Sequence, residues 1–311
     1  MSVTIFSPAK INLFLAITGR RADGFHNLVS VVAPLDFGDD LEASMVERGT
    51  ASRFRLDCDA PGIPRDDSNL VLKAAVAFAE ATGWPEATGR QGVHFKLKKR
   101  IPVGAGLGGG SSNAVAALRA MNTLSGNLVP MEKLAAIAVA LGSDCALFLH
   151  DVPVTMRGRG EQIEVLPRAA LKRLHGRKVL LFKPGFGIST PWAYGRMAAE
   201  APAHYLPALE AEQRLSRWMA GDDSVSSLLF NNMEDVAFRK FVALPVMIKK
   251  LQAGLGVAAR MSGSGSTCFA LIGEDAKTGG PGGENALVTQ MKHLIRQSWG
   301  GEAFVQETAL I

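Results

Sequence analysis

The sequence predicts an α+β fold divided into two domains. Strand-like alternation and helix-like periodicity are mixed along the chain without regular β-α-β repetition, which does not favour a doubly wound parallel sheet. A glycine-dense loop leads directly into a helix, and 311 residues are enough for two domains of ordinary size. The run Arg157–Gly160 is the best candidate for a change of domain, so we expect domains at residues 1–157 and 158–311.

The first half of the chain contains both element types, with clear signals at their ends. β-branched and aromatic residues separated by turn residues indicate strands, whereas alanine-rich periodic stretches indicate helices. Asp67–Leu70 offers a helix N-cap, and Gly83 and Gly142 are positioned to end helices. We expect strands at 10–17, 28–35 and 93–99, and helices at 70–82, 111–124 and 132–141.

The second half is predicted in the same way. Residues 178–183 are typical of a strand, and a second segment of small residues at 258–271 follows the last predicted helix. Gly279–Gly283 is expected to be a surface loop without a functional role. We expect helices at 190–199, 208–219 and 238–254.

Composition excludes several classes of protein. With 47% hydrophobic and 20% charged residues the chain can bury a full core, yet its apolar runs are too short to span a bilayer. No signal peptide is visible, and three widely spaced cysteines indicate free thiols, so we expect a cytoplasmic protein without membrane partners. The net charge of +5 is modest, and its one cluster, Lys96–Arg100, leads into the glycine loop. Attraction of a nucleotide's phosphates explains that cluster better than nucleic acid binding.

The glycine loop Val103–Ser112 has the composition of a phosphate-binding loop. Glycine lets backbone N–H groups approach an anion closely, and the helix that follows adds its N-terminal dipole and free amides. The loop is not a Walker A motif, because no Gly-Lys-Ser/Thr follows four residues after a glycine.

Gly104, Gly106 and Gly109 match G-x-G-x-x-G, so a dinucleotide-dependent oxidoreductase is a competing interpretation. The residues around the loop do not favour a dinucleotide-binding site. The preceding strand alternates polar and apolar residues, Pro102 lies in the approach, and no acidic residue follows about 20 residues later to bind a ribose.

Two further segments carry unusual chemistry. Ser7–Leu13 places Lys10 and Asn12 on one face of a strand, and Met261–Ser266 is a second loop of small residues. The three segments Pro-Ala-Lys-x-Asn-Leu, Pro-x-Gly-x-Gly-Leu-Gly-Gly-Gly-Ser-Ser-Asn and Ser-Gly-Ser-Gly-Ser, in that order, resemble the signature motifs of the GHMP kinases. This family includes galactokinase, homoserine kinase and mevalonate kinase.

Within the family the resemblance is strongest to members that phosphorylate a cytidine-bearing alcohol, and it covers nearly the whole chain. It depends on Pro8–Leu15, Thr18–His26, Asp67–Leu70, Leu141–Asp144 and Lys183–Pro191. The resemblance implies a two-domain fold with ATP and substrate in the cleft between the domains. It also implies the reaction, in which ATP phosphorylates the 2-hydroxyl of 4-diphosphocytidyl-2-C-methyl-D-erythritol in the non-mevalonate isoprenoid pathway.

The resemblance also implies roles for individual residues. Lys10 and Asp144 are the expected catalytic pair, with Asp144 accepting the hydroxyl proton and Lys10 screening the charge on the phosphoryl group. The residues expected to bind ATP are Asn69, Lys99, Pro102, Val103, Gly104, Ala105, Gly106, Leu107, Gly108, Gly109, Gly110, Ser111 and Ser112. Those expected to bind the substrate are Asn12, Phe25, His26, Thr190, Tyr194, Gly263 and Ser264.

The chain departs from the family pattern at two places. Phe25 replaces the usual tyrosine, which preserves stacking on a cytosine but removes the phenol hydroxyl. Cys145–Ala146 follows Asp144 where a proline is usual. Magnesium is implied by ATP, with Ser112 the best candidate ligand, but the histidines show no metal-ligand spacing and no resident metal site is expected.

Three alternatives remain open at this point. Another GHMP kinase, of the mevalonate or homoserine kinase type, would share the loops but not the Gly-Phe-His segment that ends at His26. A dinucleotide-dependent oxidoreductase would not consume ATP. A ligand sensor on the same fold would have no need of both Lys10 and Asp144. We expect a monomer or a weak homodimer.

Overall fold

The computed structural model describes residues 1–46, 53–85, 92–273 and 283–311. It divides into two compact units, each assembled from separate stretches of chain. Unit 1 comprises Met1–Ala9, Phe37–Val103 and Gly108–Asp151, and unit 2 comprises Lys10–Asp36, Gly104–Leu107 and Val152–Ile311. Parallel and antiparallel strand pairs occur together, which confirms the predicted α+β class. The expected boundary near residue 157 stays a prediction.

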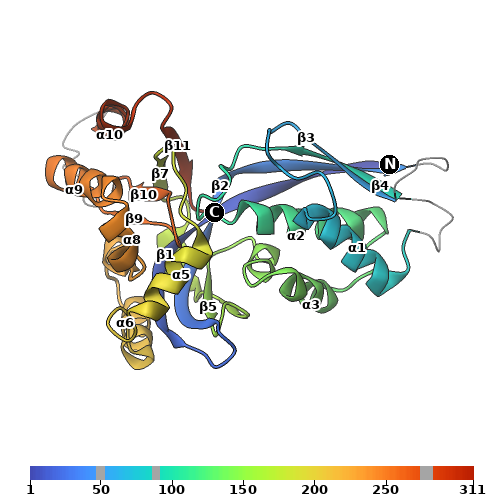
Figure 1. Cartoon of the computed structure of the whole chain (residues 1–311), viewed down its shortest axis with the longest axis horizontal. Helices are drawn as coiled ribbons and strands as arrows, with labels where there is room; N and C mark the ends of the chain where they lie inside the picture. The colour runs from blue at the N-terminus through green and yellow to red at the C-terminus, as the bar shows by residue number, and fades with distance from the viewer. Residues whose placement is uncertain (47–52, 86–91, 274–282) are drawn as a thin grey trace. The chain divides into compact units, whose positions relative to one another are not determined.

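Unit 1 packs three helices against strands. β3 (Phe54–Cys58) pairs in parallel with β4 (Gly92–Lys98), and β4 pairs antiparallel with the second half of β2 (His26–Val46). Helices α1 (Leu70–Thr82), α2 (Gly109–Leu124) and α3 (Met131–Leu141) lie together on one side of β3 and β4 (Figure 1). The short helix η2 (Ala146–Leu149) follows α3.

The ends of α1 agree with the prediction because both end signals are local. The Asn69 side chain accepts a hydrogen bond from the Val71 amide and caps the first turn. Gly83 then adopts φ 70°, the left-handed conformation that favours glycine at a helix C-terminus. Gly142 ends α3 differently, with φ 168°, which is extended backbone open to any residue.

Unit 2 contains strands from two sheets. β1 (Ser2–Arg20) enters it at Lys10 and pairs in parallel with β8 (Phe230–Asn231). The first half of β2 pairs with β5 (Val154–Arg157), which also pairs with β6 (Gln162–Val165). The other sheet is antiparallel, in the order β11 (Phe304–Ala309), β7 (Lys178–Lys183), β10 (Cys268–Leu271) and β9 (Ala259–Met261).

The core of unit 2 joins this antiparallel sheet to helices. Apolar side chains of β1, β7 and β10 bury against α5 (Thr190–Ala199), α8 (Glu234–Lys240), α9 (Ala243–Leu255) and α10 (Gly283–Trp299). α4 (Arg168–Leu174), α6 (Ala208–Ala220) and α7 (Val225–Leu228) complete the described helices of the unit. None of the helices in the described residues is both long and apolar enough to cross a membrane.

One helix prediction was wrong. The expected helix over 238–254 is two helices, α8 and α9, that are separated at Phe241 and Val242. Pro245 lies in the first turn of α9, where a missing N–H costs nothing, whereas in the interior of one long helix it would break a hydrogen bond. Of the predicted surface loop at 279–283, residues 279–282 lie outside the described residues.

Candidate active site

Lys10 and Asn12 lie on the same face of β1, as their spacing predicted. The Lys10 ammonium donates to Oδ1 of Asn12 at 2.7 Å, and both side chains are buried. Nδ2 of Asn12 donates to the Ser30 hydroxyl at 2.9 Å, and that hydroxyl donates to the Phe14 carbonyl at 2.6 Å. A fixed amide thus holds the buried ammonium in one position.

The part of the glycine loop that belongs to unit 2, Gly104–Leu107, is fixed through its carbonyl oxygens. The Leu107 carbonyl accepts from the Lys10 amide at 3.0 Å, and the Ala105 carbonyl accepts from the Thr267 amide at 3.1 Å. The Ser262 hydroxyl donates to the Gly106 carbonyl at 3.1 Å. The three segments singled out in the sequence are therefore joined by direct hydrogen bonds inside unit 2.

Gly106 is required for the close approach of two of these segments. It has φ 77°, and a Cβ placed on it would lie 2.4 Å from the Ser262 carbonyl oxygen. Gly104 also has a positive φ, 61°, but a Cβ there would meet nothing within 4 Å. The two glycines are thus needed for different reasons, packing at Gly106 and backbone conformation at Gly104.

The loop Ser262–Ser266 is fixed by a residue that the sequence analysis missed. The Asn231 amide donates to the carbonyl oxygens of Met261 and Gly263, both at 2.8 Å. The Ser264 hydroxyl lies 2.8 Å from the Thr190 hydroxyl, so two residues predicted to bind substrate are in contact. The only local sign of Asn231 was a pair of asparagines directly after the short apolar run Leu228–Phe230.

In unit 1 the remainder of the glycine loop forms the beginning of α2. Gly108 is the N-cap, with φ 70° and no side chain to cap the helix, and α2 starts at Gly109. The first amides of a helix have no intrahelical partner, so this end is suited to an anion. The Ser112 hydroxyl is buried and accepts from the Ser7 hydroxyl at 2.8 Å.

A buried carboxylate organises the approach to this helix. Asp39 is fully buried and accepts hydrogen bonds from the amides of Arg100 (2.7 Å) and Ile101 (2.8 Å) and from Nδ2 of Asn113 (2.9 Å). It also forms a buried ion pair with Lys99. The charge of Lys99 is therefore balanced inside the unit, and nothing in the local sequence indicated Asp39 as its partner.

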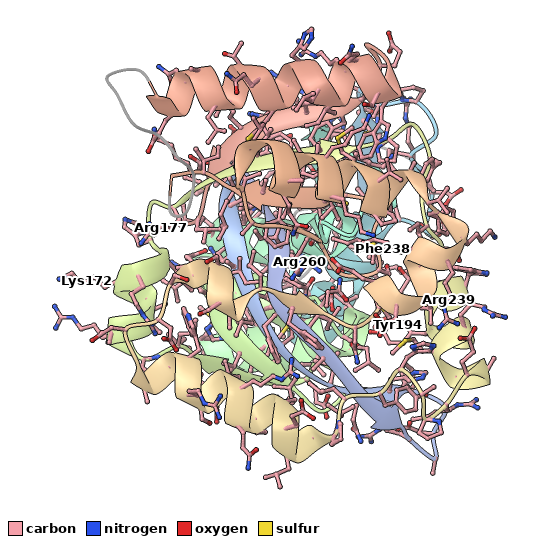
Figure 2. The ribbon with its side chains drawn as sticks, turned by 90° about the vertical axis from the view of Figure 1, so that its left-hand side faces the viewer. Lys172, Arg177, Tyr194, Phe238, Arg239 and Arg260 are labelled. Carbon is pink, nitrogen blue, oxygen red and sulfur yellow. The ribbon has the colours of Figure 1, made fainter. Side chains whose placement is uncertain are left out.

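Other cations of the 96–100 cluster are also paired. Nζ of Lys96 lies 3.6 Å from Glu42, and the Arg100 guanidinium lies 2.6 Å from Asp40. In unit 2, the basic residues labelled in Figure 2 are spread over the view, with Lys172 and Arg177 on the left, Arg260 near the middle and Arg239 on the right. The expectation of no nucleic acid partner stays a prediction.

Asp144 lies in the turn between α3 and η2, where the Cys145 amide donates to the Gly142 carbonyl at 3.0 Å. Burial raises the pKa of the Cys145 thiol to about 11, against the opposing effect of a hydrogen bond with Ser111. Since Ser111 is in the first turn of α2, that bond places the turn containing Asp144 beside the start of the helix.

The remaining residues predicted to bind ATP lie in unit 1. Asn69 caps α1 and donates to the Pro64 carbonyl at 2.6 Å, so both ends of its amide are engaged locally. Val103 is exposed and Pro102 is partly exposed at the start of the loop. The structure thus assigns Asn69 a capping function, and its role in ATP binding stays a prediction.

His26 lies in an aromatic cluster of unit 2, together with Tyr194 and Tyr205. Its side chain is 7% exposed, its ring centroid is 5.0 Å from that of Tyr194, and Nε2 lies 3.1 Å from the Tyr205 hydroxyl. Burial, followed by the nearby charge of Arg20, lowers the pKa of His26, so the ring is neutral at neutral pH. Phe25 is half exposed, and the Arg159 guanidinium lies 5.2 Å from its ring centroid.

Among the residues that the structure describes, no group of three or more histidine, cysteine or acidic side chains has an arrangement that could hold a metal ion. All three cysteines are free, as the spacing predicted, and the structure shows that all three are also buried. A cation that arrives with ATP would need few protein ligands, because Mg²⁺ in nucleotide sites is held largely by phosphates and water.

Comparison with known proteins identifies the family. The family description "GHMP kinases N terminal domain" matches residues 69–159, and "GHMP kinases C terminal" matches residues 207–278. The 4-diphosphocytidyl-2-C-methyl-D-erythritol kinase of Methylacidiphilum infernorum is 36% identical over 277 residues, covering 88% of this chain and 87% of the relative. The kinase of the same name from Parvibaculum lavamentivorans is 36% identical over 301 residues, covering 94% of each chain.

Solved structures agree with the sequence comparison. A crystal structure of 4-(cytidine 5'-diphospho)-2C-methyl-D-erythritol kinase is 32% identical, covers 99% of both chains and has a TM-score of 0.72. Homoserine kinase from Cytophaga hutchinsonii has the same TM-score at 19% identity, which shows a shared fold alone. With its three motifs joined as described and its relatives matched along nearly their whole length, this chain belongs to the 4-diphosphocytidyl-2-C-methyl-D-erythritol kinase family of GHMP kinases.

Proposed function

We propose that this chain transfers the γ-phosphoryl group of ATP to the 2-hydroxyl of 4-diphosphocytidyl-2-C-methyl-D-erythritol, a step of non-mevalonate isoprenoid biosynthesis. The observation that carries the proposal is the hydrogen-bonded assembly of Lys10, the Gly104–Leu107 segment and the Ser262–Ser266 loop. The relatives that bear this enzyme's name match the chain over most of its length and theirs, which supports the same acceptor.

ATP is the phosphoryl donor of GHMP kinases, and Gly104–Ser112 binds its phosphates. The positive φ angles at Gly104, Gly106 and Gly108 allow close backbone approach, and the uncapped start of α2 favours an anion. Phosphate binding by backbone amides needs no charged side chain in the loop, so Lys99 can remain paired with Asp39 when ATP binds.

Lys10 and Asp144 are the proposed catalytic pair. Phosphoryl transfer depends on positioning and on neutralising the charge that spreads over the transferring group. The Lys10 ammonium, held by Asn12, supplies a fixed positive charge for the γ-phosphate. Asp144 accepts the proton of the 2-hydroxyl as the new O–P bond forms, and ADP leaves with the bridging oxygen.

Phe25, His26 and Tyr194 bind the cytosine in this proposal. Tyr194 and the half-exposed Phe25 supply aromatic faces for stacking, while the neutral, buried His26 forms hydrogen bonds with the base. Asn12, Thr190, Gly263 and Ser264 contact the rest of the substrate. This is consistent with the hydrogen bond between Thr190 and Ser264 and with the bond from Asn231 to the Gly263 carbonyl.

We further propose that Mg²⁺ enters bound to the phosphates of ATP, where it neutralises their charge. Ser112 remains the candidate protein ligand: its hydroxyl already accepts from Ser7 but keeps a second lone pair. The reaction takes place in the cytoplasm, which the free, buried cysteines support. We propose a monomer or a weak homodimer, which light scattering across a concentration series tests.

One coupled assay tests the function. ADP release is measured with 4-diphosphocytidyl-2-C-methyl-D-erythritol, mevalonate, homoserine and galactose as acceptors under the same conditions. The proposal expects turnover with the first compound and a value of kcat/KM at least about 100-fold lower for the other three. Preference for one of the other alcohols would overturn the assignment of the acceptor while leaving the phosphoryl transfer chemistry intact.

A further inference from the structure

The aromatic cluster around His26 contains a second tyrosine that the proposed mechanism does not use. Tyr205 lies with its ring centroid 5.8 Å from that of His26, nearly edge-on, and its hydroxyl is 3.1 Å from Nε2. Tyr194 approaches His26 through ring packing, with the planes tilted by 40°. The imidazole thus has one nitrogen engaged by a phenol, and no hydrogen bond reaches Nδ1 from any residue that the structure describes.

A neutral imidazole has one N–H donor and one acceptor nitrogen, so the partner of one nitrogen determines what the other can do. Burial raises the pKa of the Tyr205 phenol, which keeps its proton at neutral pH. A phenol is a better donor than acceptor, so the favoured arrangement has the Tyr205 hydroxyl donating to Nε2. Nδ1 then carries the proton and faces a ligand as a donor.

The segment that carries Tyr205 is held in place from both sides. The Leu206 amide donates to the Ile17 carbonyl of β1 at 3.1 Å, and the Tyr205 amide donates to the Pro202 carbonyl at 3.0 Å. Nδ2 of Asn232 donates to the carbonyl of His204 at 2.8 Å and to that of Ile17 at 2.9 Å. Tyr205 is therefore attached through its neighbours to the strand from which the chain continues to His26.

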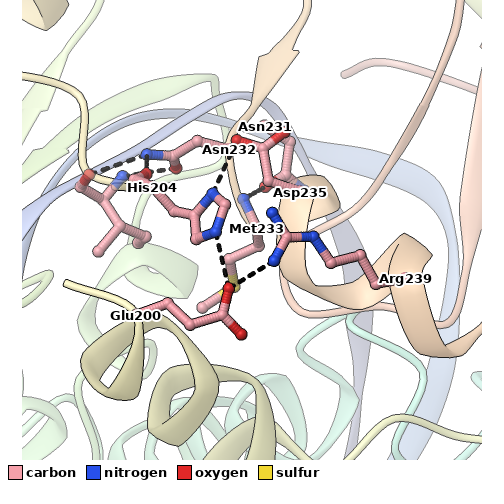
Figure 3. Close-up of polar contacts among 8 residues, drawn as sticks. Glu200, His204, Asn231, Asn232, Met233, Asp235 and Arg239 are labelled. Atoms are coloured by element: carbon pink, nitrogen blue, oxygen red, sulfur yellow. Dashed lines mark hydrogen bonds and ion pairs between the residues drawn. The ribbon is translucent and has the colours of Figure 1, made fainter. Parts of the chain in front are cut away.

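The side chain of His204 adds a second set of contacts (Figure 3). Its Nε2 lies 2.9 Å from Glu200, which also binds the Arg239 guanidinium at 2.6 Å, and its Nδ1 lies 3.5 Å from Asp235. This partly buried ionic network joins the end of α5 to the start of α8. These contacts hold the side chain of His204, the residue next to Tyr205.

We propose that Tyr205 is a positioning residue that selects cytosine over uracil by donating its hydroxyl proton to Nε2 of His26, so that Nδ1–H is directed at N3 of the base. N3 of cytosine is an acceptor, whereas N3 of uracil carries a hydrogen and would face Nδ1–H donor to donor. The inference depends on the proposed function, since it assumes that the cytidine of the substrate lies against His26.

The first test compares kcat/KM for the cytidine substrate and its uridine counterpart in the full-length wild type and in Tyr205→Phe. The variant keeps the ring and loses only the hydroxyl, so His26 can adopt either tautomer. The preference for cytidine is expected to fall at least about ten-fold, through a higher KM for the cytidine compound and little change in kcat. Lys249→Ala, at an exposed position of α9, is the control and should leave the cytidine-to-uridine ratio unchanged.

The second test is independent of activity and of the folding of any variant at position 205. The ¹⁵N chemical shifts of labelled histidine report which ring nitrogen is protonated, and the signal of His26 is assigned by its loss in His26→Gln. The wild type is expected to show Nδ1 protonated and Nε2 bare. A wild-type protein with Nε2 protonated would overturn the proposal.

The outcomes separate the inference from the function on which it depends. Active wild type with an unchanged base preference in Tyr205→Phe overturns the role of Tyr205 alone. Wild type that releases no ADP with the cytidine substrate overturns the proposed function, and with it the selection of cytosine.

Discussion

The side-chain amide of Asn231 donates to the carbonyl oxygen of Gly263 at 2.8 Å, and thereby holds the Ser262–Ser266 loop at a residue that has no side chain of its own. The same amide also donates to the carbonyl oxygen of Met261, and Oδ1 of Asn231 accepts from the Met233 amide at 2.9 Å. One buried side chain thus connects β8, the start of α8 and the loop after β9. This arrangement leads to the first prediction.

Asn231→Ala leaves two buried carbonyl oxygens without their donor. We expect the free energy of unfolding to fall by about 1–3 kcal/mol, and kcat/KM for the cytidine substrate to fall about ten-fold or more because the loop is displaced. Urea denaturation and steady-state kinetics measure the two effects. Asn285→Ala, at an exposed position of α10, is the matched control and should change neither. Equal unfolding curves for the two variants would contradict the role of Asn231.

Gly104→Ala and Gly106→Ala separate backbone conformation from close packing. Both positions have positive φ, so each alanine costs about 1–2 kcal/mol of stability. Only at Gly106 does the new Cβ also meet the Ser262 carbonyl at 2.4 Å, so the Ser262–Ser266 loop must move. We therefore expect Gly106→Ala to be the less stable variant and to bind ATP more weakly by calorimetric titration. Equal losses in both variants would show that the close approach is unimportant.

Lys10→Ala and Asp144→Ala test the catalytic pair. Each should lower kcat by about 100-fold or more, because a charge or a base is missing from the transition state, while the affinity for ATP stays largely intact. Single-turnover ADP release and nucleotide titration measure the two quantities. The exposed residues Lys249 and Asp222, changed to alanine, are the controls. Near-normal turnover in either Lys10→Ala or Asp144→Ala would exclude that residue from catalysis.

Glu234 makes stability depend on pH. Burial raises the pKa of its carboxyl from 4.5 to about 7, although the Met261 amide donates to it at 2.8 Å. A carboxyl with a raised pKa in the folded state destabilises the fold when it ionises. Its contribution is therefore most favourable below pH 4.5 and is lost as the pH rises toward 7, by about 3 kcal/mol at most.

The matching variant is Glu234→Gln, which keeps an acceptor oxygen for the Met261 amide and cannot ionise. We expect it to be more stable than the wild type at pH 8 and to show a flatter dependence of unfolding free energy between pH 5 and 8. Urea denaturation at a series of pH values measures this. Glu302→Gln, at an exposed position, should follow the wild-type profile. A Glu234→Gln profile parallel to that of the wild type would contradict the raised pKa.

Elements with local end signals could be predicted from the sequence. The bounds of α1, β7 and α5 agree with the expected ranges, because caps, prolines and glycines act on residues a few positions away. The single helix expected at 238–254 was wrong, because a proline such as Pro245 is tolerated in the first turn of a helix but not in its interior.

The candidate site was predictable where glycine and lysine occur in a family pattern, and not where a partner comes from a distant part of the chain. Asp39 binds Lys99 across 60 positions, and Tyr205 meets His26 across 179. Neither Asp39 nor Tyr205 lies in a recognisable sequence motif, because the function of each depends on which strands and turns lie together in the fold. Such supporting residues become visible only in the folded chain.

The burial of every native cysteine has a practical consequence. Cys58, Cys145 and Cys268 are all buried, and burial raises the pKa of both Cys145 and Cys268, so few thiolates are available to an alkylating reagent at neutral pH. A cysteine introduced at an exposed position such as Asp222 would then react far faster than the native three. The chain can therefore carry a single fluorescent label without removal of its own thiols.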